Sequence, residues 1–239
     1  MSLPSAASDR YALHPGVIAL PQSMLLLERS RALVVADAHL GYEDVIGGAL
    51  PLWSTHEGAE ALLAAVDRED AREIIFLGDV IHSSRMSQGA ATVVRGALAR
   101  LRARCIVTIV VGNHEGLSRG EAILGDVEDA VERDGWVLVH GDEPVLVPRA
   151  IIGHLHPSIS LGGRTSVPAF LATTRTIVVP AFTPYSPGLS VLSKDCAQAL
   201  RAFGDEHDPV VVGSAVDRVF PFGSRSALRK ALEIVKRGE

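Results

Sequence analysis

The chain has 239 residues, of which 47% are hydrophobic and 21% charged, and its formal net charge is −5. This composition supports a sizeable core, and it lacks the overall basic surplus typical of nucleic-acid-binding proteins, although a local basic patch remains compatible with it. The first ten residues contain no signal-peptide core, and no apolar run approaches about 18 residues. We therefore expect a soluble, cytoplasmic protein that does not enter a membrane.

Cysteine usage limits the metal chemistry that is open to this chain. Cys105 and Cys196 lie far apart in the sequence, and their spacing is not that of a metal site. Cys105 opens an apolar run and is predicted to be a core residue, and no disulfide is expected. Any metal chemistry must therefore come from histidine, amide and carboxylate side chains.

The first half of the chain alternates apolar runs with amphipathic segments, which is typical of a mostly parallel sheet covered by helices. Residues 1–15 are predicted to be a loose start. In chain order we then expect strands at 16–20 and 24–28 joined as a hairpin, a strand at 32–36, a long loop at 42–54, a helix capped by Thr55 and ending near Val66, a strand at 74–77, a helix at 87–103 and a strand at 106–111.

The second half is richer in strands joined by short connections. No repeat and no linker composition divides the chain, so we predict a single domain over residues 1–239 in which two sheets pack face to face with helices outside. Ser224 is expected to cap a final amphipathic helix that ends near Lys236. The strands predicted in this half lie at 136–139, 150–152, 170–182, 189–192 and 209–220.

Five polar clusters follow apolar strands, and each alone is compatible with an ordinary turn or a structural histidine. Together they are informative, because carboxylate, amide and imidazole groups at neighbouring strand ends suit hard-to-borderline divalent metals. The Asp-x-His and His-x-His pairs gain further support, since alternate residues of a strand point the same way. The clusters are Asp37-Ala38-His39, Gly78-Asp79, Gly112-Asn113-His114-Glu115, His140, and Gly153-His154-Leu155-His156.

This ordered set resembles the motifs of the calcineurin-like metallophosphoesterase superfamily, and it spans residues 37–156. The resemblance implies an α/β fold, a four-layer α/β/β/α sandwich of two mixed sheets flanked by helices, in agreement with the architecture predicted above. A less specific similarity, to the ligase-associated phosphoesterases and their archaeal relatives, rests on Leu50-Pro51, Pro180-Ala181-Phe182 and Phe222-Gly223-Ser224.

Carried onto this sequence, the resemblance implies two divalent metal ions. Manganese is expected first, with iron or zinc as alternatives, because softer metals usually recruit cysteine and neither cysteine lies near a motif. Two ions about 4 Å apart activate a bridging hydroxide and bind the phosphoryl oxygens during in-line displacement. The implied ligands are Asp37, His39 and His156 for one ion, Asn113, His140 and His154 for the other, and Asp79 as the bridge between them.

Two further histidines are candidates for catalysis. His114 follows the implied ligand Asn113, and the resemblance places it over the leaving group as the general acid, with an orienting role as the alternative. His82 stands where protein phosphatases of the superfamily carry an aspartate and where nuclease-like or nucleotide-directed members often carry a histidine. His82 therefore argues against a protein phosphatase, and it either orients His114 or closes a turn.

Candidates for substrate binding come from loops. Arg85 and Arg119 follow two of the motifs and are expected to bind phosphate oxygens, unless they are ordinary solvated arginines. The loop at 42–54, which contains Tyr42 and Trp53, is expected to border the substrate site and to stack a base, with ordinary packing as the alternative for Trp53. In the fourth motif, Asp142 stands where many members of the superfamily have a second histidine.

The leading hypothesis is a metal-dependent enzyme that cleaves phosphodiesters, and the finer similarity points to DNA strands or ends in repair, with a ligase or helicase as partner. The acidic net charge predicts weak non-specific affinity for DNA, since the dense basic clusters are limited to the arginines at 95–104 and to Arg225, Arg229 and Lys230. One alternative is a phosphodiesterase for small or cyclic nucleotides. A second is a non-catalytic metal-binding scaffold for a repair partner, against which the completeness of the motifs argues.

Overall fold

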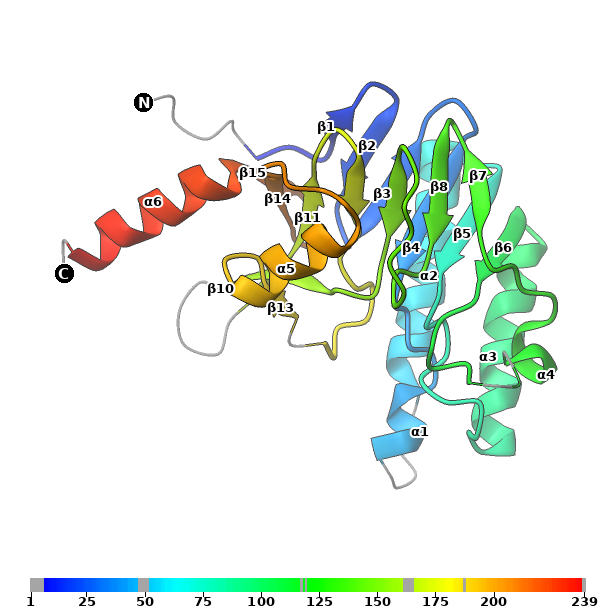
Figure 1. Cartoon of the computed structure of the whole chain (residues 1–239). Coiled ribbons are helices and arrows are strands. Elements are labelled where there is room, and N and C mark those ends of the chain that lie inside the picture. Colours follow the sequence, from blue (N-terminus) through cyan, green and yellow to red (C-terminus); the bar gives the residue numbers. More distant parts are fainter. Residues whose placement is uncertain are drawn as a thin grey trace.

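The structure is a computed structural model that describes residues 7–46, 52–116, 118, 120–160, 166–186 and 188–237. Two sheets lie face to face, and helices cover their outer faces (Figure 1). The predicted α/β sandwich with the layer order helix, sheet, sheet, helix is therefore confirmed. Leu50-Pro51, on which part of the finer similarity rests, lies outside the described residues.

The first sheet has the strand order β1-β2-β3-β4-β5-β6. Neighbouring strands from β1 to β4 are antiparallel, whereas β4, β5 and β6 run parallel, so that the carboxyl ends of these last three strands meet at one edge. The strands are β1 (Tyr11–His14), β2 (Val17–Leu20), β3 (Met24–Leu27), β4 (Ala32–Ala36), β5 (Glu73–Leu77) and β6 (Ile106–Val110).

The second sheet is also mixed. Its path runs β13-β10-β11-β12-β9-β8-β7, and β14 pairs with β11 and with β15. Strands β12, β9 and β8 are parallel to one another, which brings the ends of β8 and β9 together. The strands are β7 (Val131–Arg133), β8 (Trp136–Val139), β9 (Ala150–Ile152), β10 (Pro157–Ser160), β11 (Ser166–Ala172), β12 (Thr176–Val178), β13 (Leu189–Ser190), β14 (Val210–Ser214) and β15 (Val219–Ser224).

The helices divide between the two outer faces. Helices α2 and α3 pack on the first sheet through residues such as Leu62 and Leu98, and helices α5 and α6 reach the core of the second sheet through Leu200 and Leu228 (Figure 1). None of the described helices combines the length and the apolar character that crossing a membrane requires. The helices are α1 (Tyr42–Ile46), α2 (Trp53–Glu69), α3 (Gln88–Arg102), α4 (Glu121–Leu124), α5 (Lys194–Ala202) and α6 (Arg225–Arg237).

Strand β4 and residues 74–77 of β5 are continuous apolar runs, because both faces of these strands are covered. In β5, Ile74 and Phe76 face the core under the helices, whereas Ile75 and Leu77 face the core between the two sheets. Every residue of both strands is buried. Alternation along each strand thus supplies two separate cores, which is the physical basis of the layered architecture.

The prediction that Thr55 caps the helix ending near Val66 was wrong. Helix α2 begins at Trp53, and Thr55 lies inside it, where its hydroxyl accepts a hydrogen bond from the amide of Gly41. The predicted loop at 42–54 contains helix α1, so this interpretation was also wrong in part. In contrast, the cap by Ser224 is confirmed, because its hydroxyl accepts from the amide of Ala227 at the start of α6.

Two errors in the second half have clear local causes. The predicted strand at 170–182 is broken into β11 and β12, because the Thr173 hydroxyl accepts from the amides of Arg175 and Thr176 and so closes a turn. The sequence prediction also missed α5, although Ser193 gives a normal N-cap by accepting from the amide of Cys196.

Candidate metal centre

The predicted ligands come together because their strands end at one place. Asp37 follows β4 and Asp79 stands just beyond β5, in the parallel part of the first sheet. Asn113 follows β6, His140 follows β8, and the His154–His156 segment joins β9 to β10. Both sheets therefore direct the ends of their central strands to one edge of the sandwich, as the motif pattern predicted.

Five of the seven implied ligands have a left-handed backbone conformation, with φ between 44° and 59°. Such values are uncommon for residues other than glycine and cost free energy, so their concentration at one place indicates a functional constraint. Alternation along a strand does not explain the Asp-x-His pair, because Asp37 and His39 both lie in the connection after β4 and not within that strand. The five residues are Asp37, His39, Asp79, His154 and His156.

The first group of ligand atoms is formed by Asp37, His39 and His156, which can converge on a single ion. The Nε2 atom of His156 lies 3.1 Å from Oδ1 of Asp37. On the other side of its ring, Nδ1 of His156 is 2.6 Å from the hydroxyl of Ser186, and this contact holds the ring in place. An anchored far nitrogen is the arrangement that metal-binding histidines commonly have.

The second group is formed by Asp79, His140 and His154, with Asn113 beside them. The Nε2 atom of His140 lies 3.0 Å from Oδ1 of Asn113 and 3.2 Å from Nδ1 of His154. The opposite nitrogen of His140 lies 2.9 Å from the carbonyl of Leu77, and donation to this carbonyl by the neutral ring would leave the Nε2 lone pair directed into the group.

Asp79 stands between the two groups. Its Oδ2 atom is 3.5 Å from Nε2 of His140 and 4.0 Å from Nε2 of His39, so that one carboxylate faces a member of each group. Its Oδ1 atom accepts a hydrogen bond from the amide of His114 over 2.8 Å. This is the position that a ligand shared by two ions requires.

The site is built to hold positive charge. Burial by itself would raise the pKa of Asp79, but the hydrogen bond and the charge of His140 lower it to about 2. Conversely, burial would lower the pKa of His140, yet its hydrogen bond with Asp79 and the charges of Asp37 and Asp79 raise it to about 9. Two buried carboxylates therefore stabilise a cation at the position of His140.

His39 has the opposite character. Burial, opposed by the charge of Asp79, lowers the pKa of this imidazole to about 3. His39 is therefore neutral over the physiological range, and its Nδ1 contact of 3.1 Å with Nδ1 of His82 leaves Nε2 facing Asp79. A neutral imidazole with a directed lone pair is the form in which histidine binds metals.

A buried oxygen supports the presence of an ion at the first group. Asp37 is fully buried, and its Oδ1 atom has no hydrogen-bond partner among the described residues. Its Oδ2 atom, by comparison, accepts from the amide of His154 over 3.0 Å. A buried carboxylate oxygen without a hydrogen bond is costly, and a divalent cation would satisfy it. The donor set therefore fits the metal ions that the sequence implied.

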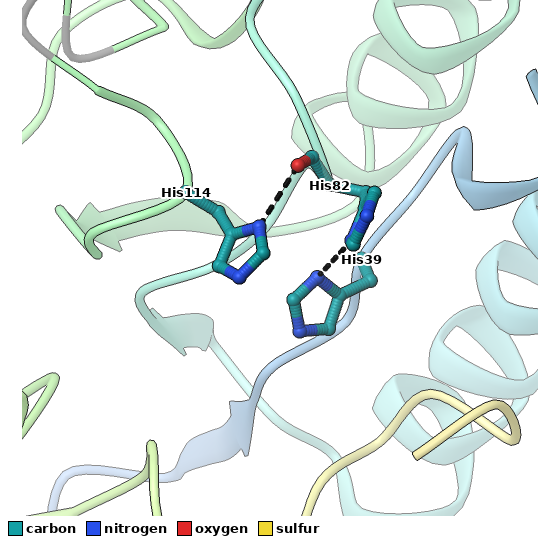
Figure 2. Close-up of side chains that lie close together, drawn as sticks. All are labelled: His39, His82 and His114. Atoms are coloured by element: carbon teal, nitrogen blue, oxygen red, sulfur yellow. Dashed lines mark hydrogen bonds between the residues drawn. The ribbon is translucent and has the colours of Figure 1, made fainter. Parts of the chain in front are cut away.

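His82 and His114 lie next to His39, a member of the first group (Figure 2). The Nδ1 atom of His114 donates to the backbone carbonyl of His82 over 2.9 Å, which leaves its Nε2 atom 3.9 Å from Oδ2 of Asp79. The ring of His82 contacts both neighbours: its Nδ1 atom lies 3.1 Å from Nδ1 of His39, and its centroid lies 4.8 Å from that of the His114 ring. These three histidines also form a possible ligand set of their own, but that set lacks a carboxylate and shares His39 with the first group.

Glu115 has a structural role that the sequence did not predict, although the residue lies within one of the motifs. Glu115 is completely buried, and its carboxylate accepts from the amides of Asp79, Ile81 and Gly112. It thereby ties the end of β5 to the end of β6 and holds the backbone that carries Asp79. Ser186, which anchors His156, was also missed, and no sequence signal pointed to it.

Gly112 permits the closest backbone approach in the centre, and Gly112→Ala is expected to destabilise the protein by about 1–3 kcal/mol. A Cβ atom there would lie 2.3 Å from the Asp79 amide nitrogen and 2.4 Å from its Oδ1 atom. Because those atoms belong to backbone and to a buried ligand, little relief is available. Equilibrium unfolding in urea would measure the loss.

Gly96→Ala provides the matched control for that experiment. Gly96 lies in α3, and a Cβ atom there meets nothing within 4 Å. This change should stabilise the protein by about 0.5–1 kcal/mol, because glycine is unfavourable in a helix. Equal effects of the two substitutions would contradict the assigned role of Gly112.

The predicted substrate-binding residues are not all brought to the centre. Arg85 is exposed, and its side chain makes no hydrogen bond or ion pair with the described residues. Arg119 lies outside the described part of the chain. Tyr42 stacks on Tyr185 with ring centroids 4.7 Å apart and touches the ring of His82, whereas Trp53 is 68% exposed. Tyr42 therefore borders the centre, as was expected for this segment.

Comparisons with known proteins reveal similarity at the level of structure. No protein-family model and no curated protein sequence matches the chain. The crystal structure of the nuclease MPE of Pseudomonas putida matches with a TM-score of 0.66 and 23% identity, covering 86% of this chain and 94% of that one. The phosphoesterase Yfce from E. coli matches with a TM-score of 0.37 and 17% identity, covering 76% of this chain and 86% of that one.

The agreement with the Pseudomonas putida enzyme extends over most of both chains, and the implied ligands lie together at one edge of the shared architecture. The two mixed sheets and their covering helices match what the order of the motifs implied. The chain thus has the fold of the calcineurin-like metallophosphoesterases.

Proposed function

We propose that this chain is a binuclear metal-dependent phosphodiesterase that acts on nucleic-acid ends. The observation that carries the proposal is the position of Asp79 between two groups of ligand atoms, each of which includes buried or half-buried histidines. The similarity of the fold to that of a nuclease supports the choice of substrate class. The finer similarity in sequence supports a role in DNA repair, with a ligase or helicase as partner.

Seven residues of this chain would bind two divalent ions. Manganese is proposed first, and iron or zinc second. Asp79 would bind both ions. When bound, the ions would neutralise the phosphoryl oxygens and lower the pKa of an attacking water. The remaining ligands would be Asp37, His39 and His156 at one ion and Asn113, His140 and His154 at the other.

His114 would act as the general acid. Its bond from Nδ1 to the carbonyl of His82 fixes the ring and leaves Nε2 to carry a proton toward the substrate. After the proton passes to the departing oxygen, the neutral ring keeps its bond to His82. His82 is then a positioning residue that acts on His114 through its backbone carbonyl and on His39 through its ring.

The predicted basic clusters are largely engaged within the chain. Arg100 in α3 pairs with Glu60 over 2.6 Å, and Arg104, just beyond α3, pairs with Asp67, so that two carboxylates of α2 face these arginines. Arg225 in α6 donates to the carbonyl of Val191. These contacts leave little free positive charge for a long duplex, which favours an end or a short strand as substrate.

The shortage of free positive charge also supports a second candidate, a phosphodiesterase for small or cyclic nucleotides. Such substrates need few phosphate contacts, and the formal net charge of −5 does not oppose their binding as it does that of long DNA. The chemistry at the metal centre would be the same in both cases, so the two candidates differ in substrate size alone.

A substrate panel with added Mn²⁺ tests the proposal. We expect diesters to be hydrolysed faster than monoesters, because a diester carries one negative charge fewer and its leaving group is a sugar oxygen that His114 can protonate. Cleavage of DNA ends should weaken with rising salt in proportion to the phosphates contacted. Faster hydrolysis of monoesters would contradict the proposal, and salt-independent turnover of small diesters without DNA cleavage would select the second candidate.

A further inference from the structure

A cavity of about 580 Å³ lies beside the metal centre, and His156 belongs to both. Its walls come from the amino-terminal half of α2, the segment after β12, and the facing parts of β10 and β11. The turns after β2 and β14 complete its rim. This volume falls within the range of about 300–1,000 Å³ that small-molecule sites usually have.

The described lining is partly apolar and rich in hydroxyl groups. Ala61, Val167 and Phe182 provide apolar surface. Hydroxyl groups also line the cavity, and those of Ser186 and Ser214 already bond to His156 and to the Leu20 carbonyl while keeping capacity for a further hydrogen bond. Glu57 carries the only permanent charge among the described lining residues, and its sign would repel a phosphate. The cavity therefore suits an uncharged group with apolar faces and polar edges.

Phe182 supplies an aromatic ring at the cavity wall. Helix α2 has a glycine opposite this ring, and a Cβ atom at Gly58 would lie 3.1 Å from Cε1 of Phe182. Glycine within a helix is unfavourable and needs a packing reason. Here the missing side chain leaves room for the ring, which stays half-buried against the helix with access to the cavity.

The cavity lies directly beside the first group of ligand atoms, at which the phosphate of a substrate would bind. Nε2 of His156 faces Asp37, and its Nδ1 atom contacts Ser186, which also lines the cavity. A phosphoryl group held at the first ligand group would thus be separated from the cavity by a single imidazole ring. The negative part of a substrate would lie at the metal centre and its neutral part in the cavity.

From these observations we propose that the cavity beside His156 binds one nucleoside of the substrate. A nucleoside is uncharged, its base offers a face for stacking on Phe182, and its edges and sugar match the hydroxyl groups of the lining. This inference rests on the proposed phosphodiesterase function and deepens it, because it names the group attached to the phosphate. A plain sugar would leave the apolar wall and the ring of Phe182 unused.

Equilibrium binding of adenosine and thymidine to the whole chain, with and without Mn²⁺, tests this proposal without turnover. We expect saturable binding that Ala61→Phe weakens by about tenfold or more, because the added ring would occupy the space of the base. Ala64→Phe is the matched control, since Ala64 lies on the same helix but is exposed and outside the cavity. This control should bind nucleosides as the wild type does.

A second variant keeps the test valid if Ala61→Phe does not fold. Val216 lines the rim from the turn after β14 and is 77% exposed, so that Val216→Trp can narrow the cavity without disturbing a core. Both cavity variants should raise KM for a dinucleoside diester and leave turnover of methyl nitrophenyl phosphate unchanged. Absence of nucleoside binding in the wild type, or equal binding in all variants, would overturn the proposal.

The outcomes separate this proposal from the proposed function. Nucleoside binding that responds to Ala61→Phe, in a protein that hydrolyses no phosphoester, would retain the cavity as a nucleoside site and reject the enzyme. Hydrolysis of small diesters without any nucleoside binding would retain the enzyme and reject the cavity as its subsite.

Discussion

Asp79→Asn is expected to lower phosphodiesterase activity by more than about 100-fold, because even residues that merely support metal ligands cost about 10–100-fold when changed. Asp79 is 2% exposed, and its Oδ2 atom faces both His39 and His140. The substitution keeps the shape of the side chain and its acceptor toward the His114 amide, but it removes the negative charge and one ligand oxygen. Both ions should therefore be affected.

Metal analysis after Mn²⁺ loading would check this directly. The wild type should contain two ions per chain, and Asp79→Asn should lose occupancy at both positions. Asp126→Asn is a matched control, because Asp126 is exposed and belongs to none of the five clusters. Loss of a single ion in Asp79→Asn would show that this carboxylate is not shared, and a metal-free wild type would end the binuclear hypothesis.

His114→Ala is expected to slow hydrolysis of a diester with a poor leaving group by about 10²–10⁴-fold, the usual contribution of a general acid. The His114 ring is held by the His82 carbonyl and faces Asp79, so its removal takes away the proton donor without removing an implied ligand. An activated nitrophenyl diester needs less protonation and should lose much less activity. Steady-state rates on the two substrates would measure the difference.

Two controls sharpen that comparison. His56→Ala removes an exposed histidine that belongs to no motif and should leave both rates unchanged. Metal content should also stay the same in His114→Ala. Equal losses on both substrates would mean that His114 only positions the phosphate, and loss of an ion would mean that His114, together with His39 and His82, acts as a ligand.

Much of the fold was predictable because it depends on local patterns. Strands such as β4 are apolar along their whole length, since both faces are covered, and Ser224 carries a normal capping signal. The errors arose where a side chain made an unexpected contact. Thr55 binds the amide of Gly41 from within α2, and Thr173 closes a turn inside a run that reads as a strand.

The proximity of the implied ligands was also predictable. Asp37, Asp79 and His140 each follow an apolar strand, and the order of their motifs alone implied that they meet. Supporting residues were harder to find, because their roles depend on contacts between segments distant in sequence. Ser186 anchors His156 across 30 positions of sequence, and no pattern around Ser186 indicates this contact.

The sequence by itself determined the alternation of strands and helices in the first half of the chain, the residue types of the implied ligands and the edge at which these residues gather, because these follow from hydrophobic periodicity and from the chemistry of strand ends. Only the tertiary structure decided which atoms face one another. It placed Asp79 Oδ2 between His39 and His140, turned His114 by a bond to the His82 carbonyl, and engaged Arg100 with a glutamate. Such relations depend on side-chain packing across the two sheets and their helices, which no local pattern specifies.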